Sequence, residues 1–349
     1  MTSNLKNKFQ NIHYDRHKPG FCLSFALSIA EFFYKNIINT KNFLYEKNIL
    51  KEEKLEIETI CIGNLTTGGV GKTPIVTILA NKLSQNKKVA IISRGYGAKL
   101  SNKTPNIIKD FEGLKFQDGR LCGDEPFQLA KKVSDNVIII TCKDRKKAIN
   151  LAIEKYGCEV AILDDGFSNR KVKKDKIILA IDSKMRFGNN HLLPYGPLRE
   201  PIKEIKRADE IILVDKDDKD ILSAIEWVKK FNLDFKVCKM RPKKIYNAVT
   251  KAKIVFENER KNAVAFCAIG QPQQFYSFLK QFYNVVETLD FSDHHKYSKK
   301  DIEKLIKIAK ENNTNTFITT QKDETKLYDL IKDIKEYSFN VLELENIIE

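Results

Sequence analysis

The sequence predicts an α/β protein with a largely parallel sheet and a second, smaller α/β lobe. Two observations carry this prediction. From about residue 57 onward, short apolar runs alternate with amphipathic helical stretches, which is typical of a parallel sheet covered on both faces. The first apolar run leads into a glycine-rich turn followed by a helix, an arrangement that suits binding of an anion.

Six runs are expected to form strands, because aliphatic residues dominate them and turn residues bound them. Amphipathic helices are expected between them, for example over 73–85 and 124–134. Three more strands are expected after residue 260, whereas the basic stretch 241–260 is expected to be irregular. The first six runs are ETICIGN (58–64), KKVAIISRGYG (87–97), NVIIIT (136–141), EVAILDD (159–165), KIILAID (176–182) and EIILVD (210–215).

The chain is accordingly divided into three parts. Residues 1–50 form an N-terminal helical region, 51–245 the core, and 246–349 the smaller C-terminal α/β lobe.

The strongest local signal is the segment ETICIGNLTTGGVGKTP (58–74). Backbone amides of such a turn and the positive end of the helix dipole can hold phosphate oxygens. Lys72 is expected to reach the β- and γ-phosphates, and the Thr73 hydroxyl to ligate magnesium. The sequence therefore predicts a P-loop NTPase-like core, although Thr66 stands where the usual pattern has its first glycine. The expected nucleotide-binding residues are Thr66, Thr67, Gly68, Gly69, Val70, Gly71, Lys72 and Thr73.

Two acidic pairs are candidates for the chemistry. Asp164 and Asp165 end an apolar strand, and the carboxyl ends of parallel strands face the ligand crevice. They are expected to hold Mg²⁺ directly or through water. In the second pair, Asp124 and Glu125, the aspartate could cap a helix that begins near Pro126 or act as a general base. The spacing leaves both interpretations open.

The adjacent histidines His294 and His295 follow Asp293. An acidic neighbour can orient an imidazole and raise its basicity, which would suit a catalytic role. A surface turn and a metal site are the alternatives.

Residues 21–45 begin with a nearly continuous apolar stretch that Glu31 and Lys35 then interrupt. A secretory signal, a short spanning helix and an amphipathic helix are the three interpretations. A cytosolic nucleotide argues against the first, and Glu31 would lie uncomfortably deep in the second. The third fits a helix lying on a membrane or packed on the protein, and membrane attachment is favoured.

The net charge is +15, and 51 of the 61 basic residues are lysines scattered along the chain. Nucleic-acid recognition usually favours clustered arginine, so a nucleic-acid binder is not expected. The lysines are interpreted first as a solvated surface in a chain with a general bias toward lysine. The functional alternative is attraction to an anionic membrane surface or to a phosphorylated substrate. Seven cysteines without a CxxC pair indicate a reducing cytoplasm.

With these motifs in hand, the chain resembles the tetraacyldisaccharide 4′-kinase family from the N-terminal helix to about residue 327. The resemblance is carried by GNLTTGGVGKTP (63–74), SRGYG (93–97), GDEP (123–126), DDGF (164–167), LLPYGPLREP (192–201), IGQPQQF (269–275), DHHKY (293–297) and TQKD (320–323), in family order. Partition-type ATPases have similar loops but usually carry a second lysine at the position of Thr67.

The resemblance implies ATP- and Mg²⁺-dependent phosphorylation of the 4′-hydroxyl of a tetraacylated glucosamine disaccharide 1-phosphate. The product would be lipid IVA, made at the cytoplasmic face of the bacterial inner membrane. A monomer is expected separately from this resemblance. Asp124 is implied as catalytic base with His294, and Glu125 beside the magnesium. Residues implied to line the substrate and nucleotide cleft are Arg94, Tyr96, Arg199 and Glu200.

Overall fold

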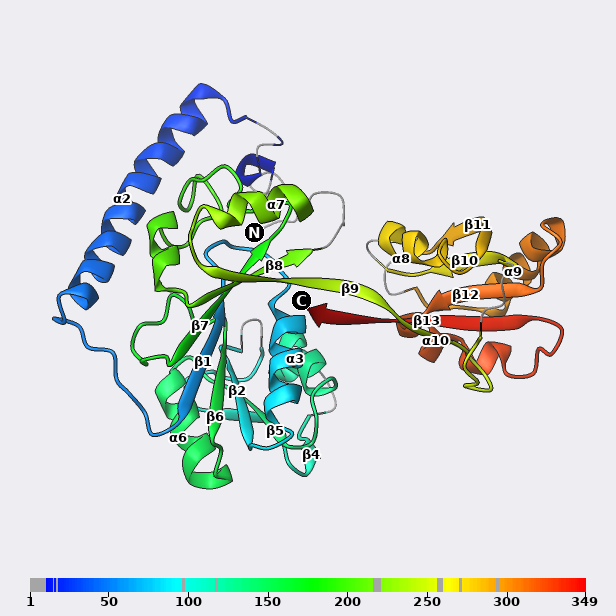
Figure 1. Cartoon of the computed structure of the whole chain (residues 1–349), viewed down its shortest axis with the longest axis horizontal. Coiled ribbons are helices and arrows are strands. Elements are labelled where there is room, and N and C mark those ends of the chain that lie inside the picture. Colours follow the sequence, from blue (N-terminus) through cyan, green and yellow to red (C-terminus); the bar gives the residue numbers. More distant parts are fainter. Residues whose placement is uncertain are drawn as a thin grey trace. The chain divides into compact units, whose positions relative to one another are not determined.

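The computed structural model describes residues 11–14, 16, 18–95, 98–116, 119–215, 221–255, 260–269, 272–292 and 295–349, with only the backbone of Gly119, Arg120, Asp124 and Thr325. The chain forms two compact units, Met1–Cys238 with Ile348–Glu349, and Lys239–Ile347. Two long strands, β9 (Asp234–Asn247) and β13 (Ser338–Ile348), carry the chain between the units (Figure 1).

The first unit contains a mostly parallel sheet in the strand order β9-β8-β7-β1-β6-β2-β5-β3-β4. The strands from β8 to β5 run parallel, and β3 and β4 add an antiparallel edge. This arrangement confirms the predicted fold class. The strands are β1 (Glu58–Gly63), β2 (Val89–Ser93), β3 (Asn106–Asp110), β4 (Gly113–Leu114), β5 (Val137–Thr141), β6 (Val160–Asp164), β7 (Lys176–Asp182) and β8 (Glu210–Asp215).

Helices bury both faces of this sheet, which is why its central strands are largely apolar. Ile60 and Ile62 of β1 pack in one cluster with Ile75 of α3, whereas Cys61 packs on the opposite face with Ala148 of α6. The helical segments of the unit are α2 (Phe21–Glu46), α3 (Lys72–Leu83), α4 (Gly119–Cys122), α5 (Asp124–Ala130), α6 (Arg145–Tyr156), the 3₁₀ segment η1 (Ile202–Arg207) and α7 (Ile221–Lys229).

The second unit has the strand order β11-β10-β12-β13-β9, in which β11, β10, β12 and β13 are parallel. The expectation of an irregular stretch at 241–260 is wrong up to Asn247, where β9 ends. Lys243 and Lys244 pair with Glu343 of β13, so cross-strand ion pairs accommodate the charge of this strand. The remaining elements are β10 (Asn262–Cys267), α8 (Pro272–Leu279), β11 (Asn284–Asp290), α9 (Lys299–Glu311), β12 (Thr316–Thr320) and α10 (Gln321–Ile331).

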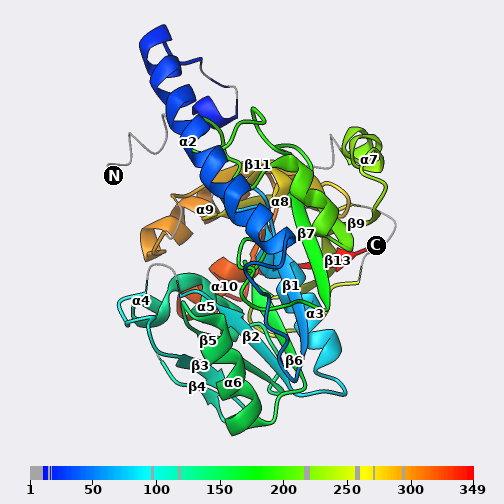
Figure 2. The same ribbon diagram turned by 90° about the vertical axis from the view of Figure 1, so that its left-hand side faces the viewer.

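The helix α2 lies on the outside of the first unit (Figures 1 and 2). By length and composition it could cross a membrane. Phe21, Phe25, Ile29 and Phe32 are exposed and recur at helical spacing on one face, while Leu27 is buried on another. The helix therefore has an exposed apolar face and a second face that packs on the unit.

Candidate active site

The site lies at the carboxyl edge of the parallel sheet. Because neighbouring strands run in the same direction, the loops that follow β1, β6, β2 and β5 emerge at one edge. These loops carry the glycine-rich segment 64–71, Asp165 and Arg94, and the loop after β5 leads to Arg145 at the start of α6. The topology thus collects residues that are far apart in the chain.

The glycine-rich segment connects β1 to α3. Gly68 and Gly71 have φ values of 103° and 101°, which only glycine adopts without strain, and Gly71 is the N-cap of α3. Lys72, the first residue of the helix, donates a hydrogen bond from Nζ to Asn64 Oδ1 at 2.9 Å. Asn64 is buried and its Nδ2 donates to the Thr66 carbonyl at 2.6 Å, so the start of the loop is held rigidly.

A second segment, 197–199, pairs with this loop. The Thr67 amide donates to the Pro197 carbonyl, and the Arg199 amide to the Leu65 carbonyl, both at 2.7 Å. The Arg199 guanidinium then reaches Asn64 Oδ1 at 2.6 Å through Nη2. Arg199 is therefore anchored to the loop by its backbone and its side chain together.

Asp165 completes this network. Its carboxylate accepts hydrogen bonds from both terminal nitrogens of Arg199, at 2.7 and 2.8 Å, and lies 3.5 Å from Lys72 Nζ. Burial alone would raise the pKa of Asp165, but Arg199 and Lys72 hold that pKa well below its usual range. Its side chain is still 40% exposed, so a charged carboxylate faces the solvent beside the loop.

Asp164, the last residue of β6, has a different environment. Burial raises the pKa of its carboxyl to about 6, against the attraction of Lys72 and with the repulsion of Asp165 and Glu125. The two adjacent aspartates thus have pKa values displaced in opposite directions. A carboxylate that is costly to ionise alone gains strongly from a bound cation.

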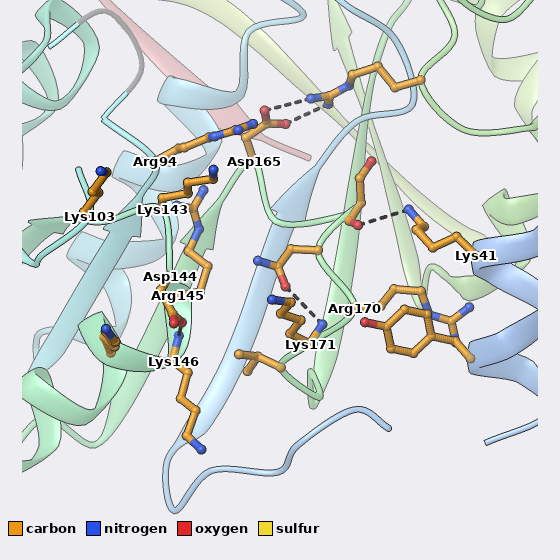
Figure 3. Close-up of a pocket in the computed structure, with 16 residues that line it drawn as sticks. Lys41, Arg94, Lys103, Lys143, Asp144, Arg145, Lys146, Asp165, Arg170 and Lys171 are labelled. Carbon is orange, nitrogen blue, oxygen red and sulfur yellow. Dashed lines mark hydrogen bonds and ion pairs between the residues drawn. The ribbon is translucent and has the colours of Figure 1, made fainter. Parts of the chain in front are cut away.

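A pocket of about 620 Å³ opens next to Asp165. Ten of its 16 lining residues are Lys or Arg and two are Asp, so it is suited to an anionic ligand. Figure 3 shows Arg94, Lys143 and Arg145 on one side of the pocket, and Lys41 and Arg170 on the opposite side. Lys41 and Tyr45 belong to α2, so the apolar N-terminal helix also contributes to the pocket.

Comparison with known proteins identifies the family of the chain. The family model described as tetraacyldisaccharide-1-P 4′-kinase (LpxK) matches residues 23–348. The chain belongs to the tetraacyldisaccharide 4′-kinase family. These kinases act in lipid A biosynthesis, so the predicted kinase function is confirmed.

Two relatives and one solved structure extend this family assignment. The tetraacyldisaccharide 4′-kinase of Halothermothrix orenii is 32% identical over 98% of this chain and 94% of its own length. That of Francisella philomiragia is 34% identical over 90% of this chain and 94% of its own. The crystal structure of LpxK from Aquifex aeolicus in complex with ATP has a TM-score of 0.63 at 33% identity, and covers 94% of this chain and 95% of that chain.

The structure brings several of the family residues expected from the sequence into contact and leaves others outside its description. Lys72, Asp165 and Arg199 form one network, whereas Glu200 is buried and bonded to α2. Glu125 is exposed on α5. Tyr96, His294 and the side chain of Asp124 lie outside the described residues.

The expectation that Asp124 could cap a helix beginning near Pro126 is wrong. The helix α5 begins at Asp124 itself, and Gly123 is its N-cap. Gly123 has a φ of 96°, which lets the chain turn sharply into the helix.

Sequence reasoning missed two residues of the site. Asn64 follows β1 directly and links Lys72 to Arg199. Arg145 is only 4% exposed, lines the pocket, and its Nε has no hydrogen-bond partner among the described residues. Both residues follow parallel strands that end at the site. Their position in the sequence could therefore have identified them as candidates.

Proposed function

We propose that this chain transfers the γ-phosphoryl group of ATP to the 4′-hydroxyl of a tetraacylated glucosamine disaccharide 1-phosphate, giving lipid IVA. The observation that carries the proposal is the convergence of Lys72, Arg199 and Asp165 around Asn64 at the start of α3. Two cations beside a helix N-terminus suit a polyphosphate. The relative that was crystallised with ATP supports the choice of nucleotide.

ATP would lie along residues 66–73, with its γ-phosphate toward the pocket. Phosphate oxygens would then take the place of Asn64 as partners of the Lys72 ammonium. The positive charge of this ammonium would offset the negative charge that develops on the leaving oxygen. Asp124, the catalytic base that the family resemblance implies, would take the proton of the 4′-hydroxyl as its oxygen bonds to the γ-phosphorus. The bond from that phosphorus to the β,γ-bridging oxygen breaks and ADP leaves.

The carboxyl end of β6 fits a magnesium ion. Asp164 is a half-buried carboxyl whose pKa desolvation raises to about 6, and Asp165 has a lowered pKa and is partly exposed. No three His, Cys, Asp or Glu side chains gather as a metal cluster in the described ranges. Mg²⁺ would therefore be held by Thr73, Asp164 and Asp165, with Glu125 nearby, together with phosphate and water oxygens, and would neutralise charge on the phosphates.

The cationic pocket would receive the disaccharide 1-phosphate head group. Arg145 provides a nearly buried guanidinium, and Lys143 and Arg94 lie beside it. Charge-assisted hydrogen bonds of this kind are stronger than neutral ones and orient a phosphate through the planar guanidinium.

The enzyme would meet its lipid substrate at the cytoplasmic face of the inner membrane. The apolar face of α2 exposes Phe25 and Phe32, each with 62% of its surface accessible, and the net charge of +15 favours an anionic surface. Because the opposite face of the helix contacts the protein along its length, we propose that α2 lies along the membrane surface.

The deciding experiment is transfer of labelled γ-phosphate from ATP to a purified acylated disaccharide 1-phosphate in detergent micelles. We expect label in the lipid product and little free phosphate without acceptor. Rapid ATP hydrolysis with no labelled lipid would contradict the proposal and favour a partition-type ATPase.

A further inference from the structure

The helix α2 docks on the first unit through specific polar contacts. Glu31 accepts a hydrogen bond from the Leu192 amide at 2.7 Å, and the Tyr34 hydroxyl donates to the Arg199 carbonyl at 2.9 Å. A helix whose only task was to reach lipid would need no polar bonds to a loop that also forms the phosphate site. These contacts point to a second role for α2.

The closest link is a buried carboxylate. Glu200 has no exposed surface; its Oε1 lies 2.9 Å from Lys41 Nζ and its Oε2 accepts a hydrogen bond from Asn42 Nδ2 at 2.9 Å. Asn42 is itself only 1% exposed, although it lies in a helix that is long and apolar enough to cross a membrane. A buried charge requires such partners, so Glu200 fixes the position of the loop relative to α2.

Glu200 is next in the chain to Arg199, which contacts the phosphate site. The backbone of Arg199 is bonded to Leu65 of the loop and to Tyr34 of the helix. Its guanidinium holds Asn64 and Asp165. The helix also contacts the loop after β6, because Lys41 Nζ donates to the Ser168 carbonyl at 3.4 Å.

We propose that α2 positions the phosphate site. Lys41 and Asn42 are positioning residues that hold Glu200, and thereby Arg199, against Asn64 and Asp165. The inference rests on the proposed phosphoryl transfer and adds that the helix facing the membrane also sets the geometry around the nucleotide phosphates. Displacement of α2 from its docking face would then lower activity even where membrane binding persists.

The test compares Asn42→Ala with Asn36→Ala in the full-length protein. Asn36 lies on the same helix but is exposed, and its amide donates to the Phe32 carbonyl of the helix itself, so the same amide is removed outside the docking face. We expect Asn42→Ala to lower kcat and weaken ATP binding, each by about tenfold to a hundredfold, because misplaced groups lose much of their effect. Flotation with anionic liposomes should be unchanged for both variants, and Asn36→Ala should retain the wild-type kcat.

A swapped pair separates positioning from loss of fold. In the double variant Asn42→Asp with Glu200→Gln, the Gln amide can donate to the new carboxylate, which restores the bond with its polarity reversed. Recovery of kcat above that of each single variant supports the proposal. A double variant no faster than Glu200→Gln alone, or wild-type kcat and ATP affinity in Asn42→Ala, would overturn it. Wild-type protein that binds ATP without labelling the lipid would refute the proposed function, and the ATP affinity of Asn42→Ala would still decide the inference.

Discussion

Asp164 offers a direct test of the electrostatics at the end of β6. Its folded-state pKa of about 6 exceeds the ordinary value of 3.8, so the folded protein disfavours the ionised form. A difference of about two units corresponds to about 3 kcal/mol, which solvent relaxation reduces to a net cost of about 1 to 3 kcal/mol. Asp164→Asn removes this charge and should stabilise the unit by that amount above pH 6, although it removes a proposed magnesium ligand.

The sign of the effect of Asp164→Asn on the free energy of unfolding follows from its pH dependence. Well below pH 3.8 the carboxyl is protonated in both states, so the substitution should have no electrostatic effect on the free energy of unfolding there. As the pH rises from 4 to 6, the unfolded chain ionises first and the wild type loses stability relative to the variant. Urea unfolding at pH 4.5 and pH 8 measures the difference without added magnesium. The single tryptophan, Trp227, packs on Phe187 in the first unit, so its fluorescence reports the unfolding of that unit.

Asp165→Asn is the matched control, with the opposite sign. The pKa of Asp165 is held below its usual range, so its charge adds stability above the unfolded pKa that is lost as the pH falls. Asparagine tolerates the positive φ of 59° at this position, so no backbone strain is added. At pH 8 we expect Asp164→Asn to stabilise and Asp165→Asn to destabilise. Destabilisation by both, or an Asp164→Asn effect independent of pH, would refute the reasoning.

Three further predictions concern activity and membrane binding. Lys72→Ala should lower kcat by several orders of magnitude with an unchanged fold, whereas Lys82→Ala, exposed on the same helix, should not; equal transfer rates would exclude the proposed phosphate site. Arg145→Gln should raise KM for the acylated disaccharide about tenfold or more while KM for ATP stays constant, and the reverse pattern would assign Arg145 to the nucleotide. Serine at both Phe25 and Phe32 should weaken liposome binding by about 2 kcal/mol, or roughly thirtyfold, and unchanged flotation would place the membrane contact elsewhere.

The alternation of strands and helices could be predicted because each central strand is buried on both faces and must be apolar. The edge strand β3 could not be predicted in this way. Lys109 interrupts β3 with a charged side chain, and the structure accommodates it by burying the ammonium against the Ser134 carbonyl at 2.7 Å. Residues such as Lys243 were equally misleading, because their partner Glu343 lies 100 residues away. Charge in a strand is uninformative until its cross-strand partner is known.

At the site, too, the partners of individual side chains could not be predicted from the sequence. Motif resemblance places Arg199 and Glu200 together in one functional segment, but the structure separates them: the Arg199 side chain faces the phosphate loop, and the Glu200 side chain faces α2. The partner of Glu200, Asn42, is 158 residues distant and lies in the apolar N-terminal helix, for which the sequence favours membrane attachment. A buried amide in such a helix is costly unless it bonds to something specific. That cost, more than the apolar residues around it, is the reason to regard α2 as part of the catalytic unit.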